Sequence, residues 1–185
     1  DFTGFRNHTI DGDLRKRDFT INSMAIRWED FYPQRRMDAV LDPCGGQEDI
    51  KQKLIRATSE QSLEDDPLRM LRAFRIEAEL KFQIDDAVLS QISELHPRIA
   101  DVAEERIREE LDRFFLQPDS AAAWKLISSS ALFQSLTPEL ALMKGCEQGG
   151  YHHLDVWDHT LMSLEKLEAL IAVLPEVFPD HAKNI

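Results

Sequence analysis

The sequence predicts a mostly α fold, with a small α+β piece at the N-terminal end followed by an all-helical neck and body. Up to about residue 57, short alternating stretches and turn residues are typical of strands and loops. From about Leu63 onward, apolar residues recur at helical spacing. We therefore expect four segments, covering residues 1–60, 61–117, 118–150 and 151–185.

The N-terminal segment combines strand, turn and short-helix signals. INSMAIRW (21–28) and RMDAVLD (36–42) alternate roughly between apolar and polar residues, with EDFYPQ between them, which predicts a hairpin. DPCGG (42–46) predicts a turn. The next stretch, GQEDIKQKL (46–54), predicts a short helix on which Glu48 can pair with Lys51 or Gln52. LIRAT (54–58) is expected to be extended.

The remaining chain is expected to be helical. Asp65 or Asp66 is expected to cap a helix that has Pro67 at its first position and runs to about Leu80. The periodicity predicts further helices over residues 85–96, 102–116, 118–130 and 151–174.

Bulk composition is that of an ordinary globular protein. Of the 185 residues, 43% are hydrophobic and 30% are charged. No apolar run approaches the roughly 20 residues of a membrane span, and no signal-peptide pattern is present. Cys44 and Cys146 lack CxxC spacing, so we expect free thiols in the cytoplasm. The chain opens on Asp1 and ends on Ile185 without a helix stop signal, so we interpret it as a fragment.

The net charge of −12 argues against a surface that is basic overall and holds nucleic acid by counterion release. Charge distribution matters more than the sum, however. Arginines cluster at 15–17, 35–36, 69–75 and 106–113, which is compatible with a local basic groove.

Two stretches carry candidate binding residues. In DLRKRDFTINSMA (13–25), the clustered Arg and Lys side chains are either solvated at the surface or bind a polyphosphate. In the second case, Asp18 and Asn22 could form hydrogen bonds with a ribose hydroxyl. In residues 62–80, Asp65 and Asp66 are expected to face Arg69 across a helical turn. Such exposed pairs contribute only about 0.2–1 kcal/mol. Since Arg69, Arg72 and Arg75 lie on one strip and repel each other, stability alone explains them poorly.

A carboxylate held beside a guanidinium can read a base. It would accept from the exocyclic amino group of cytosine or adenine and donate to the adjacent ring nitrogen. Guanine and uracil present a carbonyl and a ring N–H instead, so like groups would face each other. Unpaired polar groups in a tight site are costly, which permits strong discrimination.

Four stretches together carry a family resemblance. DLRKRDFTINSMAI, LDPCGGQEDIKQKLIRA, DDPLRMLRAFR and ERIREELDRFF, in this order, resemble the bacterial tRNA nucleotidyltransferase and poly(A) polymerase family. These class II nucleotidyltransferases add CCA, part of CCA, or poly(A) to RNA 3′ ends. The resemblance covers about residues 7–116. GYHHLDVWDHTL (150–161) resembles the opening of the HD-type domain that many members carry.

The resemblance implies roles for particular residues. Arg17, Asp18 and Asn22 match the element that contacts the nucleotide's ribose and triphosphate, with Lys16 in place of its first arginine. Asp65, Asp66 and Arg69 match the EDxxR element, whose Asp and Arg read the edge of C or A. Arg72 and Arg75 continue that pattern, with a phosphate-binding or structural role. The four segments would then be the end of the catalytic head, the neck, the body and the start of an HD-like domain.

The catalytic metal site is expected outside the chain. The resemblance implies that Mg²⁺ is held by carboxylates upstream of residue 1, so the chain alone is expected to be inactive. We interpret Asp11 and Asp13 of the DGD sequence as a solvated turn. His152, His153, Asp155 and His159 form a His-rich stretch, in which His159 matches the first ligand of HD-type domains.

The expected function is therefore RNA-specific nucleotide addition. The full-length protein would transfer CMP or AMP from CTP or ATP to an RNA 3′ end, with tRNA as the expected substrate. A non-catalytic RNA-binding module and a fragment of an HD-type phosphohydrolase are the alternatives.

Overall fold

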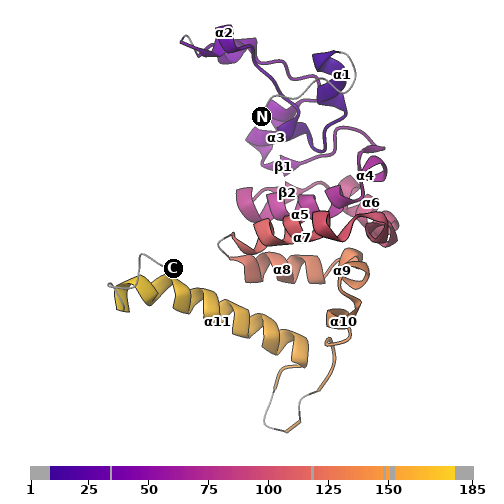
Figure 1. Ribbon diagram of the computed structural model, residues 1–185, viewed down its shortest axis with the longest axis vertical. Coiled ribbons are helices and arrows are strands. Elements are labelled where there is room, and N and C mark those ends of the chain that lie inside the picture. The colour runs from indigo at the N-terminus through magenta and orange to yellow at the C-terminus, as the bar shows by residue number, and fades with distance from the viewer. Residues whose placement is uncertain (1–8, 34, 118, 148, 151–152, 178–185) are drawn as a thin grey trace.

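The computed structural model describes residues 9–33, 35–117, 119–147, 149–150 and 153–177. Helices stack on one another along the longest axis, from the short N-terminal elements at one end to the long C-terminal helix at the other (Figure 1). In the described ranges, the named strands form one two-stranded sheet. The predicted mostly α fold is confirmed.

The N-terminal elements are α1 (Ile10–Arg15), the 3-10 helix η1 (Thr20–Asn22), α2 (Trp28–Phe31), the 3-10 helix η2 (Met37–Ala39), α3 (Gly46–Gln52) and β1 (Leu54–Ile55). The middle of the chain forms α4 (Ser62–Asp65), α5 (Leu68–Leu80), β2 (Gln83–Ile84), α6 (Asp86–Leu95), the 3-10 helix η3 (His96–Asp101) and α7 (Glu104–Phe115). The last elements are α8 (Ser120–Ser128), α9 (Ala131–Leu136), α10 (Pro138–Ala141) and α11 (Val156–Val177).

The predicted hairpin is reduced to one antiparallel bridge. Ala25 and Leu41 exchange backbone hydrogen bonds of 3.0 and 2.7 Å, but the residues between them form α2 and η2 instead of strands. The exposed Trp28 and Tyr32 rings stack on each other with centroids 5.5 Å apart. Alternation of residue types was a weak signal here, because a strand also needs a neighbour with which to pair.

The turn before α3 is fixed by one carboxylate and one glycine. Asp42 accepts hydrogen bonds from the Gly46 and Gln47 N–H groups, at 2.7 and 2.9 Å, which satisfies two free donors at the helix start. Gly45 has a φ of 79°, a conformation that glycine adopts without strain. The predicted turn and short helix are confirmed, and Glu48 accepts from both Lys51 and Gln52.

Helix α3 holds η1 at very close range. A Cβ on Gly46 would lie 2.2 Å from the Thr20 carbonyl oxygen, so only glycine fits there. The Thr20 hydroxyl donates to the buried Asp49 carboxylate at 2.6 Å. These contacts fix the backbone that carries Asp18 and Asn22.

The helix that was predicted from Asp65 or Asp66 is interrupted once. Asp66 is extended, with φ −149° and ψ 98°, and separates α4 from α5. Its carboxylate accepts from the Leu68 N–H at 3.3 Å, so it caps the start of α5 as expected. Pro67 lies just before the helix instead of at its first position. The predicted end at Leu80 is correct.

A short parallel sheet joins the N-terminal piece to the neck. Strand β1 pairs with β2, which the sequence did not predict, and Ile55 and Ile84 of these strands are buried. The Arg56 guanidinium lies 3.5 Å from Asp49 and 3.4 Å from Asp85, which link it to α3 and to the N-terminal cap of α6. The expected helices over 85–96 and 102–116 correspond to α6 and α7.

The body is held by a chain of aromatic rings. Centroids of Phe114, Trp124, Phe133 and Trp157 follow one another at 5.8, 5.8 and 4.7 Å, and all four residues are buried. These four rings connect α7, α8, α9 and α11, so they hold the last helix against the neck. The predicted helices over 118–130 and 151–174 correspond to α8 and α11, whereas α9 and α10 were not predicted.

In the part of the chain that the structure describes, no helix combines the length and the hydropathy needed to cross a membrane. Cys44 and Cys146 are both free thiols, as expected.

Candidate nucleotide-binding site

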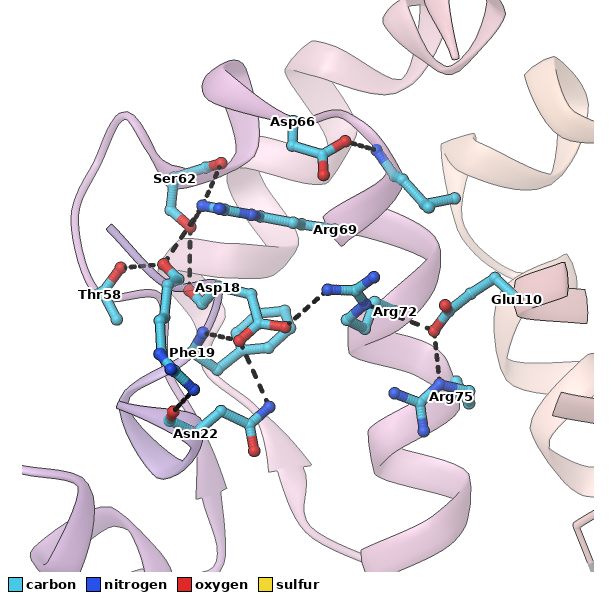
Figure 2. Close-up of polar contacts among 12 residues, drawn as sticks. Asp18, Phe19, Asn22, Thr58, Ser62, Asp66, Arg69, Arg72, Arg75 and Glu110 are labelled. Carbon is cyan, nitrogen blue, oxygen red and sulfur yellow. Dashed lines mark hydrogen bonds and ion pairs between the residues drawn. The ribbon is translucent and has the colours of Figure 1, made fainter. Parts of the chain in front are cut away.

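Asp18 is the centre of a buried polar network (Figure 2). One carboxylate oxygen accepts from the Phe19 N–H at 2.8 Å and from the Asn22 amide at 3.3 Å. The other accepts from the Arg72 guanidinium at 3.1 Å. Asp18 and Asn22, the two residues predicted to bond a ribose hydroxyl, are therefore close together, and Asp18 connects the N-terminal piece to α5.

Arg17 joins the same network from the other side. Its guanidinium lies 3.2 Å from Asp13 and donates to the Asn22 carbonyl oxygen at 3.5 Å. Its own carbonyl oxygen accepts from the Thr58 hydroxyl at 2.6 Å. The side chain is about half exposed, at 49%. Arg17 is thus open to a ligand, as is the exposed Asn22, whereas Asp18 is buried.

Carboxylates from α5 itself and from other elements neutralise Arg72 and Arg75 of the arginine strip. Arg72 lies between Asp18 and Glu110, and the Arg75 guanidinium contacts Glu79 at 2.7 Å. Arg75 also donates to Glu110, whose carboxylate is buried on α7. The repulsion that the sequence implied is therefore offset by acids that lie up to 54 residues away along the chain.

Asp65 and Asp66 pair with distant cations and not with Arg69, which corrects the expected pairing within the helix. The Lys16 ammonium lies 3.4 Å from Asp65, and the Arg106 guanidinium donates to Asp66 at 2.7 Å. The Arg69 backbone N–H donates to the Asp66 carbonyl oxygen at 3.0 Å, but no hydrogen bond or ion pair joins the side chains of these two described residues. The break between α4 and α5 is the physical reason, because helical spacing no longer applies across it.

Arg69 holds the N-terminal piece against the neck and is also a candidate binding residue. Its side chain is buried, and its two terminal nitrogens donate to the carbonyl oxygens of Lys16, Arg17 and Ser62 at 2.9–3.2 Å, and to the Ser62 hydroxyl at 2.8 Å. The Nε–H of Arg69 is buried, with no hydrogen-bond partner among the described residues.

The electrostatics keep both groups charged. Burial acts to raise the pKa of Asp66, but the hydrogen bond and charge of Arg106, with the Leu68 N–H, outweigh it and hold that pKa below its ordinary value. Burial lowers the pKa of the Arg69 guanidinium, against the opposing effect of Asp18 and Asp66. An arginine remains protonated at neutral pH even so. The site thus offers an acceptor-only carboxylate near a donor-only guanidinium.

Asp66 and Arg69 lie on the wall of one pocket of about 630 Å³. This volume is typical of small-molecule sites. Its charged lining includes Lys16, Asp65, Asp66, Arg69, Arg98 and Arg106. The other predicted residues, Arg17, Asp18, Asn22, Arg72 and Arg75, form the adjoining network, which Arg69 connects to the pocket.

The DGD sequence does not fit a metal. Asp11 and Asp13 lie on α1 and not in the solvated turn that we predicted, because the Thr9 side chain caps this helix. They pair with Arg15 at 2.9 Å and Arg17 at 3.2 Å. Within the described ranges, no three His, Cys, Asp or Glu residues gather in a way that could hold a metal ion.

The His-rich stretch is only partly described. His152 lies outside the described residues, and His159 is on the first turn of α11. The Asp155 carboxylate accepts from the Gly145 and Asp158 N–H groups, at 2.6 and 2.7 Å, so it holds the start of this helix. These hydrogen bonds lower the pKa of Asp155 below its ordinary value, Asp158 contributing most. The role of His159 as a metal ligand stays a prediction.

Sequence reasoning missed Arg106 and Glu110. Both lie in the quoted ERIREELDRFF stretch, but neither was singled out. Glu110 could have been noticed, because it lies on the α7 face that also carries the apolar Ile107, Leu111 and Phe114. No local signal marks Arg106, whose partner is 40 residues away.

Two family models match the chain. One, described as "Poly A polymerase head domain", matches residues 3–56, and the other, described as "Probable RNA and SrmB- binding site of polymerase A", matches residues 81–143. The chain is 38% identical over 163 residues to the A-adding tRNA nucleotidyltransferase of Deinococcus radiodurans. The aligned residues make up 85% of this chain and 36% of that protein. It is 34% identical over 170 residues to the CC-adding tRNA nucleotidyltransferase of Thermus thermophilus. The aligned residues make up 89% of this chain and 37% of that protein.

Solved structures agree with these matches. The Bacillus stearothermophilus CCA-adding enzyme in complex with CTP aligns with a TM-score of 0.59 and 30% identity, covering 67% of this chain and 30% of that one. The Thermotoga maritima CCA-adding enzyme complexed with tRNA aligns with a TM-score of 0.60 and 28% identity, covering 72% and 32%. The chain spans little more than a third of the length of the two curated relatives. With its head and RNA-binding matches in the expected order, it belongs to the bacterial tRNA nucleotidyltransferase and poly(A) polymerase family.

Proposed function

We propose that the full-length protein adds CMP or AMP from CTP or ATP to RNA 3′ ends, with tRNA as the substrate, in the cytoplasm. The RNA 3′-hydroxyl oxygen forms a bond to the α-phosphorus, and pyrophosphate leaves with the bonding electron pair. The names of the two relatives, and the CTP and tRNA in the two similar structures, support this reaction. A role in RNA binding alone would not account for the CTP that is bound in the structure of a similar enzyme.

The observation that carries the proposal is the pair Asp66 and Arg69 on the wall of one pocket. Asp66 supplies an ionised acceptor, and the Nε–H of Arg69 has no hydrogen-bond partner among the described residues. Cytosine and adenine offer an amino donor next to a ring-nitrogen acceptor, so they satisfy both groups. Uracil and guanine leave both unpaired, at a cost of about 1–3 kcal/mol for each buried group.

The network beside the pocket binds the rest of the nucleotide. Arg17 has an exposed fork that suits a phosphate, and Asp18 and Asn22 lie within reach of each other and of a ribose hydroxyl. Arg72 and Arg75 are already matched by acids, so their part is chiefly to hold Asp18 and Glu110 in position. Asp65 holds Lys16 at the pocket rim.

Other regions complete the proposed protein. Residues 1–60 are the end of the head, 61–117 the neck, 118–150 the body and 151–185 the start of an HD-like domain, in which His159 is the first metal ligand. RNA lies on the neck and body, which the match of residues 81–143 to an RNA-binding model supports. Mg²⁺ would neutralise the departing pyrophosphate. The described residues do not fit this ion, and we place its ligands upstream of residue 1.

The test is incorporation of each labelled nucleotide into tRNA that lacks its 3′ end, using the full-length protein. Asp66→Asn keeps the size of the side chain and replaces one acceptor by a donor. Its preference for CTP and ATP over UTP and GTP should fall by about 5- to 150-fold, which corresponds to one or more mispaired buried groups. Glu64→Gln is the matched control, because Glu64 is exposed on α4. Unchanged preference in Asp66→Asn would refute the base-reading role.

A further inference from the structure

Asp66, the acceptor of the proposed base-reading pair, already accepts hydrogen bonds from other groups of the protein. Oδ1 of Asp66 accepts from the Leu68 N–H, at the start of its own helix. Oδ2 accepts from Nη2 of Arg106, a residue of α7. Since Asp66 and Arg106 both line the pocket, the guanidinium lies at the carboxylate that a base would approach.

The two donors are chemically alike. The Arg106 terminal nitrogen is a planar NH₂ group, as is the exocyclic amino group of cytosine or adenine. Each can donate one N–H to a carboxylate oxygen. At 2.7 Å, the Arg106 contact has the length of a charge-assisted hydrogen bond. Arg106 thus satisfies the carboxylate in the way that a C or A base would.

Arg106 is free to leave. Its side chain is 49% exposed, and the only hydrogen bond of this side chain among the described residues is the one to Asp66. When it is released, its charge is hydrated at the surface. Asp66 is 23% exposed, so it is the partner that needs a replacement donor. An ion pair between partly exposed groups is weak enough for a ligand to exchange.

We propose that Arg106 is an internal substitute for the base: in the empty pocket it donates to the Asp66 oxygen that the amino group of cytosine or adenine takes in the loaded pocket. This inference rests on the proposed base-reading role of Asp66. Arg106 is then a specificity-determining residue. Cytosine and adenine place an amino donor where uracil and guanine place a carbonyl, so only cytosine and adenine replace what Asp66 loses.

The experiment compares equilibrium binding of CTP, ATP and UTP to the full-length protein and its variants. Arg106→Met removes the donor but keeps an unbranched apolar stem. We expect the Kd for CTP and ATP to fall by about two- to fivefold, the range that exposed ion pairs span. The Kd for UTP should not fall, because UTP gains nothing from an unoccupied carboxylate. Arg106→Lys, which keeps a charged donor, should lie close to the wild type.

Arg108→Met is the matched control for charge. It removes the same charge from the same helix, but Arg108 is 84% exposed and its partner is Asp112, outside the pocket. Equal tightening of all three nucleotides in both variants would overturn the proposal, because it would indicate a general electrostatic effect. A higher Kd for CTP in Arg106→Met would also overturn it, because Arg106 would then position Asp66 and not compete for it.

Failure of this inference is distinct from failure of the proposed function. If Asp66→Asn weakens CTP binding while Arg106→Met does not strengthen it, Asp66 reads the base and Arg106 is not its substitute. If Asp66→Asn leaves the affinities for CTP and UTP unchanged, the base-reading role itself fails, and the substitute role fails with it.

Discussion

Glu110 on α7 gives the sharpest prediction about stability. Its carboxylate is buried and connects two arginines of α5, Arg75 through a direct hydrogen bond and Arg72 across 3.6 Å. Glu110→Ala would leave two cations facing an apolar gap between the helices. Breaking a buried ion pair by removing one partner typically costs about 3–5 kcal/mol.

The expected loss is smaller than that range. After the substitution, Arg72 still contacts Asp18 at 3.1 Å and Arg75 still contacts Glu79 at 2.7 Å. Both arginines are also partly exposed, at 28% and 15%, so water can hydrate them. We therefore expect the free energy of unfolding to fall by about 2–3 kcal/mol in Glu110→Ala. Glu110→Gln keeps an acceptor and the volume, and should lose about 1 kcal/mol.

Urea unfolding followed by tryptophan fluorescence measures these losses. Trp124 and Trp157 are buried in the body, so their emission reports unfolding. A loss of 2–3 kcal/mol would lower the urea midpoint by about 1 M. Glu109→Ala is the control, because Glu109 is the exposed neighbour on the same helix and should change stability by less than about 0.5 kcal/mol. Equal midpoints for Glu110→Ala and Glu109→Ala would refute the assigned role.

Three further outcomes are expected. Gly46→Ala should lower the free energy of unfolding by about 2–3 kcal/mol in the same titration, because its Cβ would meet the Thr20 carbonyl oxygen. Glu168→Ala removes the acceptor of the Ser120 hydroxyl at the start of α8, so amide exchange along α11 should accelerate by about tenfold. Asp155 has a lowered folded pKa, so its contribution to stability is present above its unfolded pKa of about 3.9 and is lost as pH falls through the folded value. Urea midpoints at pH 6 and pH 3 should therefore differ less in Asp155→Asn than in the wild type.

The helices were predictable because their signals are local. Asp85 caps α6 with a 2.9 Å bond to the Ala87 N–H, and α6 and α7 follow apolar periodicity to within about two residues. The predicted hairpin failed for the opposite reason. Residues 21–42 have the alternation of strands, but pairing depends on neighbours that a local pattern does not specify. Strand β2 has only two residues, too few for any periodicity.

The candidate site divides in the same way. Asp18 and Asn22 are four residues apart, so their contact was within reach of local reasoning. The partners of Asp66 and Arg72 are 40 and 54 residues away, and nothing in helical spacing selects them. The repulsion among three arginines on one strip was evident from the sequence, but its compensation by acids was not predicted. Where the compensating acids come from is a property of the packing of α5 against α7 and the N-terminal piece.

The double role of Arg69 decides which variant tests base reading. Its guanidinium holds the carbonyl groups of Lys16, Arg17 and Ser62, so Arg69→Ala removes a joint between the N-terminal piece and the neck together with a donor. Relaxed nucleotide choice in Arg69→Ala would therefore not distinguish loss of the donor to the base from loss of these structural contacts. Asp66→Asn leaves these Arg69 contacts in place, and its amide oxygen can still accept from the Leu68 N–H, although the ion pair with Arg106 is lost. Relaxed choice in Asp66→Asn at an unchanged urea midpoint would therefore assign selectivity to the hydrogen bond with the base, whereas a lowered midpoint would assign it to loss of structure.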